Sequence, residues 1–228
     1  QVQGTLFFDI LRVLEHKAPR VFCLENVKNL RSHNGGRTFR VIVDSLRSLG
    51  YDVHAEVLNS MAYVPQRRER IFIVGFRKDR FGDASKDFEF PEIALDASKF
   101  EGDLPVVRDI LESDPDPKYT HTDKGWGCIL SHADRHKAKG NGFGYSLVDL
   151  DSHTRTLTAN YYKDGQCILI PHEGKNPRRL TPRECARLQG FPDSFKIPVS
   201  NTQAYKQFGN SVVVPLVEDV ARRVRKFF

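Results

Sequence analysis

The sequence feature that most constrains the fold is a strand–helix–strand pattern between residues 21 and 76. Residues 21–27 (VFCLENV) form a short apolar run interrupted by a Glu-Asn pair, which is typical of a strand buried on both faces. Residues 38–49 place their apolar side chains on one face of a helix, and residues 51–58 and 70–76 have the composition of further strands. Strand, helix and strand at this spacing predict a parallel α/β sheet, although these residues supply too few strands for a complete one.

Helices are predicted on either side of this pattern. Residues 6–16 repeat apolar side chains with helical periodicity and are followed by Pro19, which ends a helix. Another helix begins after Thr181, where the sequence TPRE combines an N-cap, a first-turn proline and a capping-box glutamate. Residues 213–227 are amphipathic and end in basic residues, while residues 117–179, with many glycines and short alternating runs, predict a loop-rich β region.

Charge is distributed unevenly along the chain and indicates its domain organisation. The whole chain carries 35 Lys and Arg against 29 Asp and Glu, a net charge of +6 that mildly favours a polyanionic partner. Residues 80–116 carry 4 basic against 11 acidic residues and contain several prolines, which predicts a connector; the alternative is a solvated surface of a single domain. The predicted domains are therefore residues 1–79, 80–179 and 180–228.

The composition excludes several classes of protein. No apolar run approaches the roughly 18 residues of a membrane span, and residues 1–20 lack the layout of a signal peptide, so we expect a cytoplasmic protein without a membrane partner. The four cysteines, Cys23, Cys128, Cys167 and Cys185, show no CxxC pairing. This spacing argues against a disulfide scaffold and against a thiolate metal site, and it fits a reducing compartment.

Glu25 is predicted at the carboxyl end of a buried strand, where open α/β sheets bind their ligands. A carboxyl group in this place can hydrogen-bond an amide-like edge and act as a proton donor. Capping of the following loop through backbone N–H groups explains the same position equally well.

Gln66, Arg68 and Arg70 occupy alternate positions leading into a predicted strand, so their side chains point to one side. Aligned donors of this kind suit phosphate or carbonyl oxygens, although the spacing alone favours a surface strand of mixed charge. Near the C-terminus, Gly209-Asn210-Ser211 predicts a turn that offers backbone N–H groups to a small ligand. By itself this signal is weak, because Gly-Asn turns are common.

Taken together and in this order, these stretches resemble the motifs of one enzyme family. ENVKNL, QRRERI, LTPRECARLQGFPDSF and QFGNSVVVPLV are similar to motifs VI, VIII, IX and X of the cytosine-5 DNA methyltransferases, and GTLFFDI at residues 4–10 is similar to motif V. The resemblance covers essentially all of residues 1–79 and 179–228. The segments KGNGFGYSL (139–147) and RTLTANYYKDG (155–165) are similar to target-recognition regions of the bacterial, Dcm-like members.

This resemblance implies a fold, a reaction and partners. The fold is a partial S-adenosylmethionine-dependent methyltransferase domain of Rossmann-like α/β type, with a smaller, loop-rich β target-recognition domain inserted. Members of the family attack C6 of a cytosine flipped out of double-stranded DNA with a cysteine thiolate, take a methyl group from S-adenosylmethionine onto C5, and release the enzyme by elimination. The resemblance further implies a specific duplex target, as in restriction-modification systems, and no metal.

The resemblance also assigns roles residue by residue. Glu25 matches the residue that hydrogen-bonds N3 and eases attack at C6, Arg70 matches the arginine that contacts the cytosine O2, and Arg68 matches its neighbour in the active site. The positions that match the cofactor pocket are Leu6, Asn210, Ser211 and Val212. The positions that match DNA-binding residues are Gln66 and the Thr156-Leu157 pair of the recognition domain.

The nucleophile of this family is absent from the sequence. It is the cysteine of a Pro-Cys motif, and residues 1–228 contain no Pro-Cys; the glycine-rich FxGxG turn and the acidic residue that holds the ribose are also missing. Cys23 shares strand parity with Glu25, but we interpret it as a buried structural thiol. Because the chain opens with Gln1, we expect an N-terminal segment, in this chain or in a second subunit, to carry the nucleophile, and we expect residues 1–228 alone to be inactive.

A second function stays open: a non-catalytic DNA-binding or accessory subunit derived from the same fold. The presence of Glu25, Arg68, Arg70 and Asn210 together favours the enzyme, because a chain without a catalytic role would have no chemical reason to keep all four. The coding sequence before Gln1 distinguishes the two functions, since a Pro-Cys shortly upstream supports the enzyme.

Overall fold

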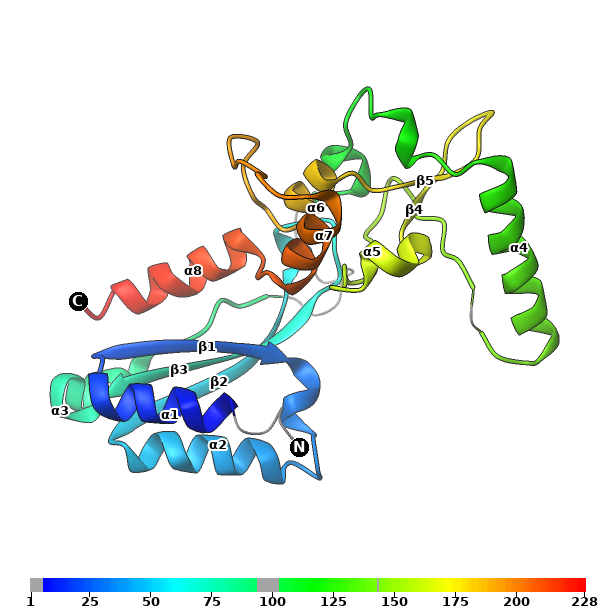
Figure 1. Ribbon diagram of the computed structural model, residues 1–228. Coiled ribbons are helices and arrows are strands. Elements are labelled where there is room, and N and C mark those ends of the chain that lie inside the picture. The colour runs from blue at the N-terminus through cyan, green and yellow to red at the C-terminus, as the bar shows by residue number, and fades with distance from the viewer. Residues whose placement is uncertain (1–5, 94–102, 143) are drawn as a thin grey trace. The chain divides into compact units, whose positions relative to one another are not determined.

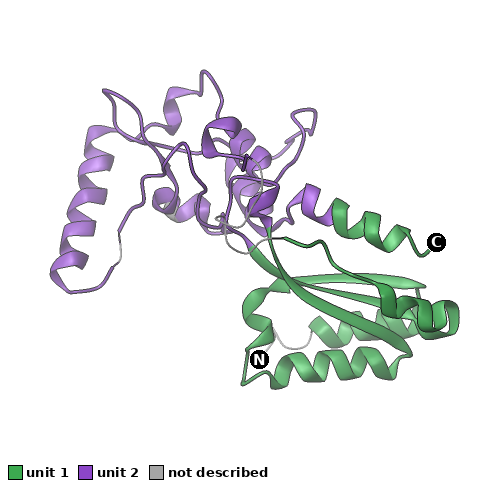
Figure 2. Ribbon diagram, turned by 180° about the vertical axis from the view of Figure 1, so that it is seen from behind, with its two compact units in different colours: residues 1–59, 69–95, 218–228 green, residues 60–68, 96–217 purple. Residues whose placement is uncertain are grey.

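The computed structural model describes residues 6–93, 103–142 and 144–228. The chain divides into two compact units, coloured separately in Figure 2, and each has its own apolar core. Unit 1 consists of residues 1–59, 69–95 and 218–228, and unit 2 of residues 60–68 and 96–217.

The units follow different boundaries from the predicted domains. Residues 60–68, which connect two strands of the sheet, belong to unit 2, and so do residues 180–217. Backbone hydrogen bonds explain the first difference: Thr154 donates to the carbonyl of Pro65 at 2.8 Å and accepts from the N–H of Arg67 at 3.0 Å. The segment is thus held by residues far away in the sequence. The catalytic and recognition roles assigned to the predicted domains stay predictions.

The helices and strands of unit 1 follow the predicted pattern. They are α1 (Leu6–Lys17), β1 (Val21–Val27), α2 (Arg37–Ser48), β2 (Tyr51–Asn59), β3 (Glu69–Arg77), α3 (Lys78–Phe81) and the part of α8 (Val214–Arg225) that follows residue 217. All the helices and strands predicted within residues 6–76 are found, with ends that agree to within one residue. Local periodicity was therefore sufficient to locate them.

The sheet of unit 1 corrects the predicted strand pairing. Among the described strands of this sheet the order is β1-β3-β2, and β3 runs antiparallel to both neighbours. β1 and β2 consequently run in the same direction, but they are not hydrogen-bonded to each other (Figure 1). The prediction of parallel pairing is wrong because β3, which comes later in the chain, lies between the two strands that α2 connects.

The strand that is buried along its length is β3 rather than β1. Residues 71–76 of β3 are all buried, whereas β1 alternates between buried, partly buried and exposed positions and leaves Cys23 exposed, contrary to prediction. The cause is position, since β3 is central and β1 pairs on one side only among the described strands. α1 and α2 cover one face of the sheet (Figure 1). On the other face, Phe76 packs against the rings of Phe88 and Phe227.

Unit 2 differs more from prediction. Its helices and strands are α4 (Asp123–Ala138), α5 (Tyr161–Asp164), β4 (Leu169–Ile170), β5 (Arg178–Arg179), α6 (Pro182–Leu188), α7 (Asn201–Asn210) and the start of α8. The predicted loop-rich β region instead has a 16-residue helix, α4, as its longest described element. This helix was not predicted for two reasons. Gly125 and Gly127 lower its helix propensity, and with Ile129 as its one buried residue it lacks a clear apolar face.

The predicted acidic connector is partly structural core. Val107 and Ile110 are buried in the apolar cluster of unit 2, so the stretch contributes more than a solvated link. Residues 94–102 of the connector lie outside the described residues.

The capping box predicted at the start of α6 is confirmed. Thr181 Oγ1 accepts the Glu184 N–H at 3.1 Å, and the Glu184 carboxylate accepts the Thr181 N–H at 2.8 Å. The same carboxylate is fully buried and forms a two-bond ion pair with Arg178, at 2.7 and 2.8 Å. The sequence predicted the cap but not the ion pair. The feature that could have indicated it is the pair Arg178-Arg179, which comes just before the sequence LTPRE.

We expect Glu184→Gln to lower the free energy of unfolding by about 3–5 kcal/mol, because the variant leaves Arg178 buried and charged without its carboxylate. Chemical denaturation followed by circular dichroism measures the change. The matched control is Asp193→Asn, which removes the more exposed ion pair with Arg187 and should cost at most about 1 kcal/mol. Equally small losses in both variants would show that burial adds nothing to the Arg178–Glu184 pair.

Candidate functional site

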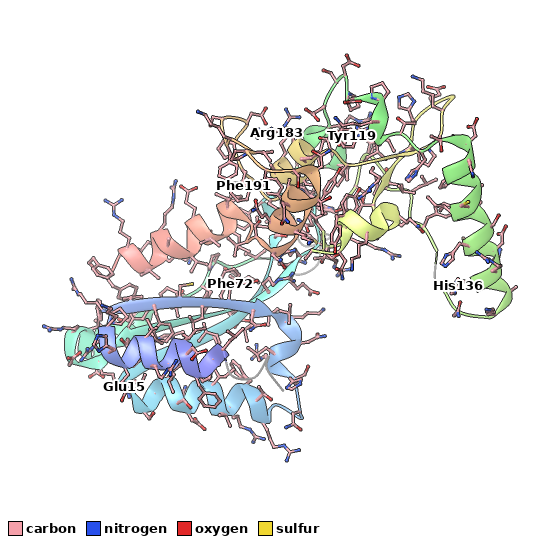
Figure 3. The ribbon with its side chains drawn as sticks, in the orientation of Figure 1. Glu15, Phe72, Tyr119, His136, Arg183 and Phe191 are labelled. Carbon is pink, nitrogen blue, oxygen red and sulfur yellow. The ribbon has the colours of Figure 1, made fainter. Side chains whose placement is uncertain are left out.

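Unit 1 brings together Glu25 of β1 and Arg70 of β3. The register places Glu25 opposite Phe72, which is labelled in Figure 3, and Val27 opposite Arg70, so Glu25 and Arg70 are diagonal neighbours on one face of the sheet. Arg70 Nε lies 3.0 Å from Glu25 Oε1, and the Glu25 side chain is 28% exposed. Desolvation lowers the pKa of Arg70, while the nearby charge of Glu25 opposes that shift. The guanidinium therefore orients a carboxylate that still reaches solvent.

Unit 1 contains a cavity of about 540 Å³, and Glu25 is one of the residues that line it. Its apolar wall comes largely from α1 and α2 and includes Leu6, while Asn26 and Thr38 are polar residues of the lining. The predicted cofactor residue Leu6 and the predicted catalytic residue Glu25 thus share one cavity. Residues 4 and 5 of the GTLFFDI motif lie outside the described residues.

The surroundings of Cys23 and Cys185 disfavour the thiolate form of both side chains. Desolvation and, second, the charge of Glu25 raise the pKa of the Cys23 thiol to about 11, although the residue as a whole is exposed. Cys185 is buried, and desolvation raises the pKa of its thiol well above the ordinary range. Reactive cysteines have the opposite surroundings, in which a cation or a helix N-terminus favours the thiolate.

In unit 2, Gln66 and Arg68 bind backbone groups. Their side chains are 0% and 3% exposed. Gln66 Oε1 accepts the N–H of Leu157 at 2.7 Å and its Nε2 donates to the carbonyl of Leu188 at 3.1 Å, while Arg68 donates to the carbonyl of Leu157 at 2.9 Å. Carbonyl oxygens are thus the partners observed for these aligned donors. Because Gln66 and Leu157 are both buried, this geometry does not favour the predicted direct contact of either with DNA.

The predicted Gly-Asn-Ser turn is the end of a helix. Gly209 and Asn210 are the last residues of α7, and Ser211 is its C-cap. Asn210 is exposed, whereas Ser211 and Val212 are partly buried. Gly209 packs so closely against Thr158 that an added Cβ would lie 2.3 Å from the Thr158 carbonyl oxygen. Sequence reasoning missed this contact, for which the signal was a glycine within a helical stretch.

The predicted recognition region contains a groove of about 480 Å³ whose lining includes Lys137 and Arg155. Several glycines also line it, so backbone groups are accessible there. Thr156, next to Arg155, is partly buried, and its hydroxyl donates to a backbone carbonyl at 2.7 Å. Residue 143, within the KGNGFGYSL segment, lies outside the described residues.

The described ranges contain neither a cluster of metal ligands nor a membrane-spanning helix. No group of three or more His, Cys, Asp or Glu side chains there could hold a metal ion. No helix among the same residues is long and apolar enough to span a membrane.

Solved structures of methyltransferases share this fold. The Dnmt2 methyltransferase of S. pombe has a TM-score of 0.68 and 22% identity, covering 96% of this chain and 72% of that protein. A putative DNA modification methyltransferase encoded within a prophage of E. coli has a TM-score of 0.64 and 20% identity, covering 98% of this chain and 74% of that one. At these identities the likeness shows the fold alone, which is the α/β fold of these methyltransferases.

Sequence comparison shows the family. The family model described as "C-5 cytosine-specific DNA methylase" matches residues 1–226, and the chain belongs to this family. "Type II methyltransferase M.NlaX" of Neisseria lactamica is 49% identical over 225 residues, which cover 98% of this chain and 68% of that protein. The "DNA-cytosine methyltransferase" of Escherichia coli (strain K12) is 43% identical over 252 residues, covering 96% and 52%. The chain thus spans about half to two thirds of the length of these relatives.

Proposed function

We propose that this chain is part of a DNA (cytosine-5-)-methyltransferase. The enzyme moves a methyl group from S-adenosylmethionine to C5 of a flipped cytosine in a specific duplex site, within the restriction-modification system of a bacterial cytoplasm. The observation that carries the proposal is the Glu25–Arg70 ion pair, with its 3.0 Å separation, in a chain that matches the cytosine methylase family over residues 1–226. Relatives named as type II methyltransferases support the restriction-modification context.

Glu25 and Arg70 would act on the cytosine ring. C5 of cytosine is a poor nucleophile until C6 has been attacked, because the ring then becomes an enamine. In its protonated form, Glu25 would donate a hydrogen bond or its proton to N3, which withdraws electrons from the ring and eases that attack. Arg70, besides orienting Glu25, would contact O2, so the two side chains together read the edge of the flipped base. Flipping costs a few kcal/mol, which these pocket hydrogen bonds and phosphate contacts must offset.

S-adenosylmethionine is the cofactor that membership of this family supports. Asn210 exposes an amide at the end of α7, where Ser211 adds a hydroxyl and Val212 an apolar side chain, and Leu6 lines the cavity that contains Glu25. Each of these residues is proposed separately to contact the cofactor, on the family resemblance of its own motif. When bound, S-adenosylmethionine supplies an electrophilic methyl group.

The nucleophile would come from a segment that precedes residues 1–228, in the same chain or in a second subunit. The raised thiol pKa values of Cys23 and Cys185 argue against both as substitutes. The relatives have room for such a segment, since this chain spans 68% of one and 52% of another.

Site choice would reside in residues 117–179. This segment carries 10 basic against 6 acidic residues, and its groove offers Lys137, Arg155 and accessible backbone groups to DNA. Base edges specify a sequence, whereas phosphate contacts add affinity for all sequences alike.

The proposal is tested with the complete gene product, labelled S-adenosylmethionine and duplex DNA. The expected product is 5-methylcytosine, identified by mass spectrometry of the digested nucleosides. Methylation at a different atom would contradict the proposed reaction. Tight duplex binding without any transfer would instead support a non-catalytic accessory subunit. In such a subunit the Glu25–Arg70 pair would have no catalytic role.

A further inference from the structure

The Arg68 side chain contacts three backbone carbonyls from two distant parts of unit 2. Its Nη1 donates to Leu157 at 2.9 Å, and its Nη2 donates to Ser211 at 2.7 Å and to Gly209 at 3.2 Å. The residue is only 3% exposed. A guanidinium presents several donors in one rigid plane, so a single side chain can hold all three oxygens at once.

Gln66 binds the same residue, Leu157, through its backbone N–H group. While Arg68 binds the carbonyl of Leu157, Gln66 accepts the N–H of Leu157 at 2.7 Å and donates to Leu188 at 3.1 Å. Both polar groups of the Leu157 backbone are thus satisfied by two side chains that lie two positions apart. A buried backbone group that loses such a partner is destabilised, so this arrangement strongly favours one backbone path.

The two segments that Arg68 joins also pack directly against each other. A Cβ on Gly209 would lie 2.3 Å from the carbonyl oxygen of Thr158 and 2.5 Å from the nitrogen of Ala159. Residues 156–159 and 209–211 therefore share one close contact, with the Arg68 guanidinium bonded to both.

We propose that Arg68, assisted by Gln66, is a positioning residue that sets the backbone of 156–158 and 209–211 together. This inference rests on the proposed function, in which site choice resides in residues 117–179, the segment that contains Thr156-Leu157, and Asn210-Ser211 contact the cofactor. Arg68 then couples the geometry of the two binding sites instead of touching the cytosine itself.

The test compares Arg68→Lys with Arg67→Lys in the complete gene product. Arg67 is the matched control because its side chain is exposed, one position away on the other side of the segment. Lysine keeps the charge but cannot reach three carbonyls in one plane.

We expect Arg68→Lys to accelerate amide hydrogen exchange in 156–159 and 208–212 by at least about tenfold, with little change elsewhere. KM for DNA and for S-adenosylmethionine should rise together by roughly tenfold while kcat changes by less than about threefold.

A second variant, Gln66→Leu, leaves the guanidinium intact and removes the acceptor of the Leu157 N–H. It should accelerate exchange at Leu157 and raise the same two KM values, even if Arg68→Lys folds poorly.

Unchanged exchange in both segments together with a kcat reduced by about a hundredfold or more would overturn the proposal and make Arg68 a catalytic residue. Uniformly faster exchange across unit 2 would overturn it too, since that result indicates a general structural role. If the unaltered protein transfers no methyl group, the proposed function fails, while the exchange measurements still decide whether Arg68 joins the two segments.

Discussion

Residues 1–228 alone should transfer no detectable methyl group from S-adenosylmethionine to duplex DNA. Without a thiolate to attack C6, C5 stays unreactive whatever Glu25 does. With its pKa raised to about 11, the Cys23 thiol is almost entirely protonated at neutral pH. Radiolabelled transfer, measured with the chain alone and after addition of the segment that precedes it in the gene, in cis or as a second polypeptide, checks this expectation.

Activity should appear only when the preceding segment is added. A matched control replaces its Pro-Cys cysteine by serine, which should abolish transfer again without affecting association. Robust transfer by residues 1–228 alone, lost in Cys23→Ser or in the corresponding variant of Cys128, Cys167 or Cys185, would identify a nucleophile within the chain and contradict the proposed division of roles.

The added segment should also improve solubility. β1 pairs on one side only among the described strands, and α1 exposes Leu6, Phe8 and Val13 by 65%, 53% and 59%. Unpaired strand edges and contiguous apolar surfaces promote association. Sedimentation of the chain with and without the segment should therefore show fewer aggregates in its presence.

Glu25→Gln should lower kcat of the complete enzyme by roughly 10²–10⁴, the usual contribution of a positioned acid or base. Glutamine keeps the size of the side chain but cannot supply a proton to N3. Duplex affinity should change by only a few-fold, since DNA binding depends mainly on phosphate contacts. Single-turnover methyl transfer and fluorescence anisotropy with labelled duplex measure the two quantities separately.

The matched control for this variant is Glu56→Gln. Glu56, on strand β2 of the same sheet, is also paired with an arginine, Arg31 at 3.9 Å, but its side chain is 51% exposed. It should retain full activity. A loss of only a few-fold in Glu25→Gln, or an equal loss in Glu56→Gln, would remove the catalytic role and leave Glu25 as the structural partner of Arg70.

The sequence by itself determined the local elements and the family. α1, β1, α2, β2 and β3 agree with prediction to within one residue because apolar periodicity and end signals such as Pro19 act over a few neighbouring positions. The capping box of Thr181 and Glu184 is local in the same way, so it too could be recognised. The helix α4 escaped prediction because its glycines and its single buried residue, Ile129, give a weak local pattern.

Tertiary structure decided what depends on distant partners. The antiparallel insertion of β3 between β1 and β2 follows from hydrogen bonds between strands, to which side-chain periodicity is insensitive. The alternation of Gln66 and Arg68 correctly put both side chains on one side. Their partners could not be predicted, because Leu157, which both side chains bind, lies about 90 positions away, and Ser211, which Arg68 also binds, lies more than 140 positions away. A buried guanidinium donates to the oxygens that lie near it in the folded protein. The carbonyl oxygens that Arg68 binds are brought together only by folding.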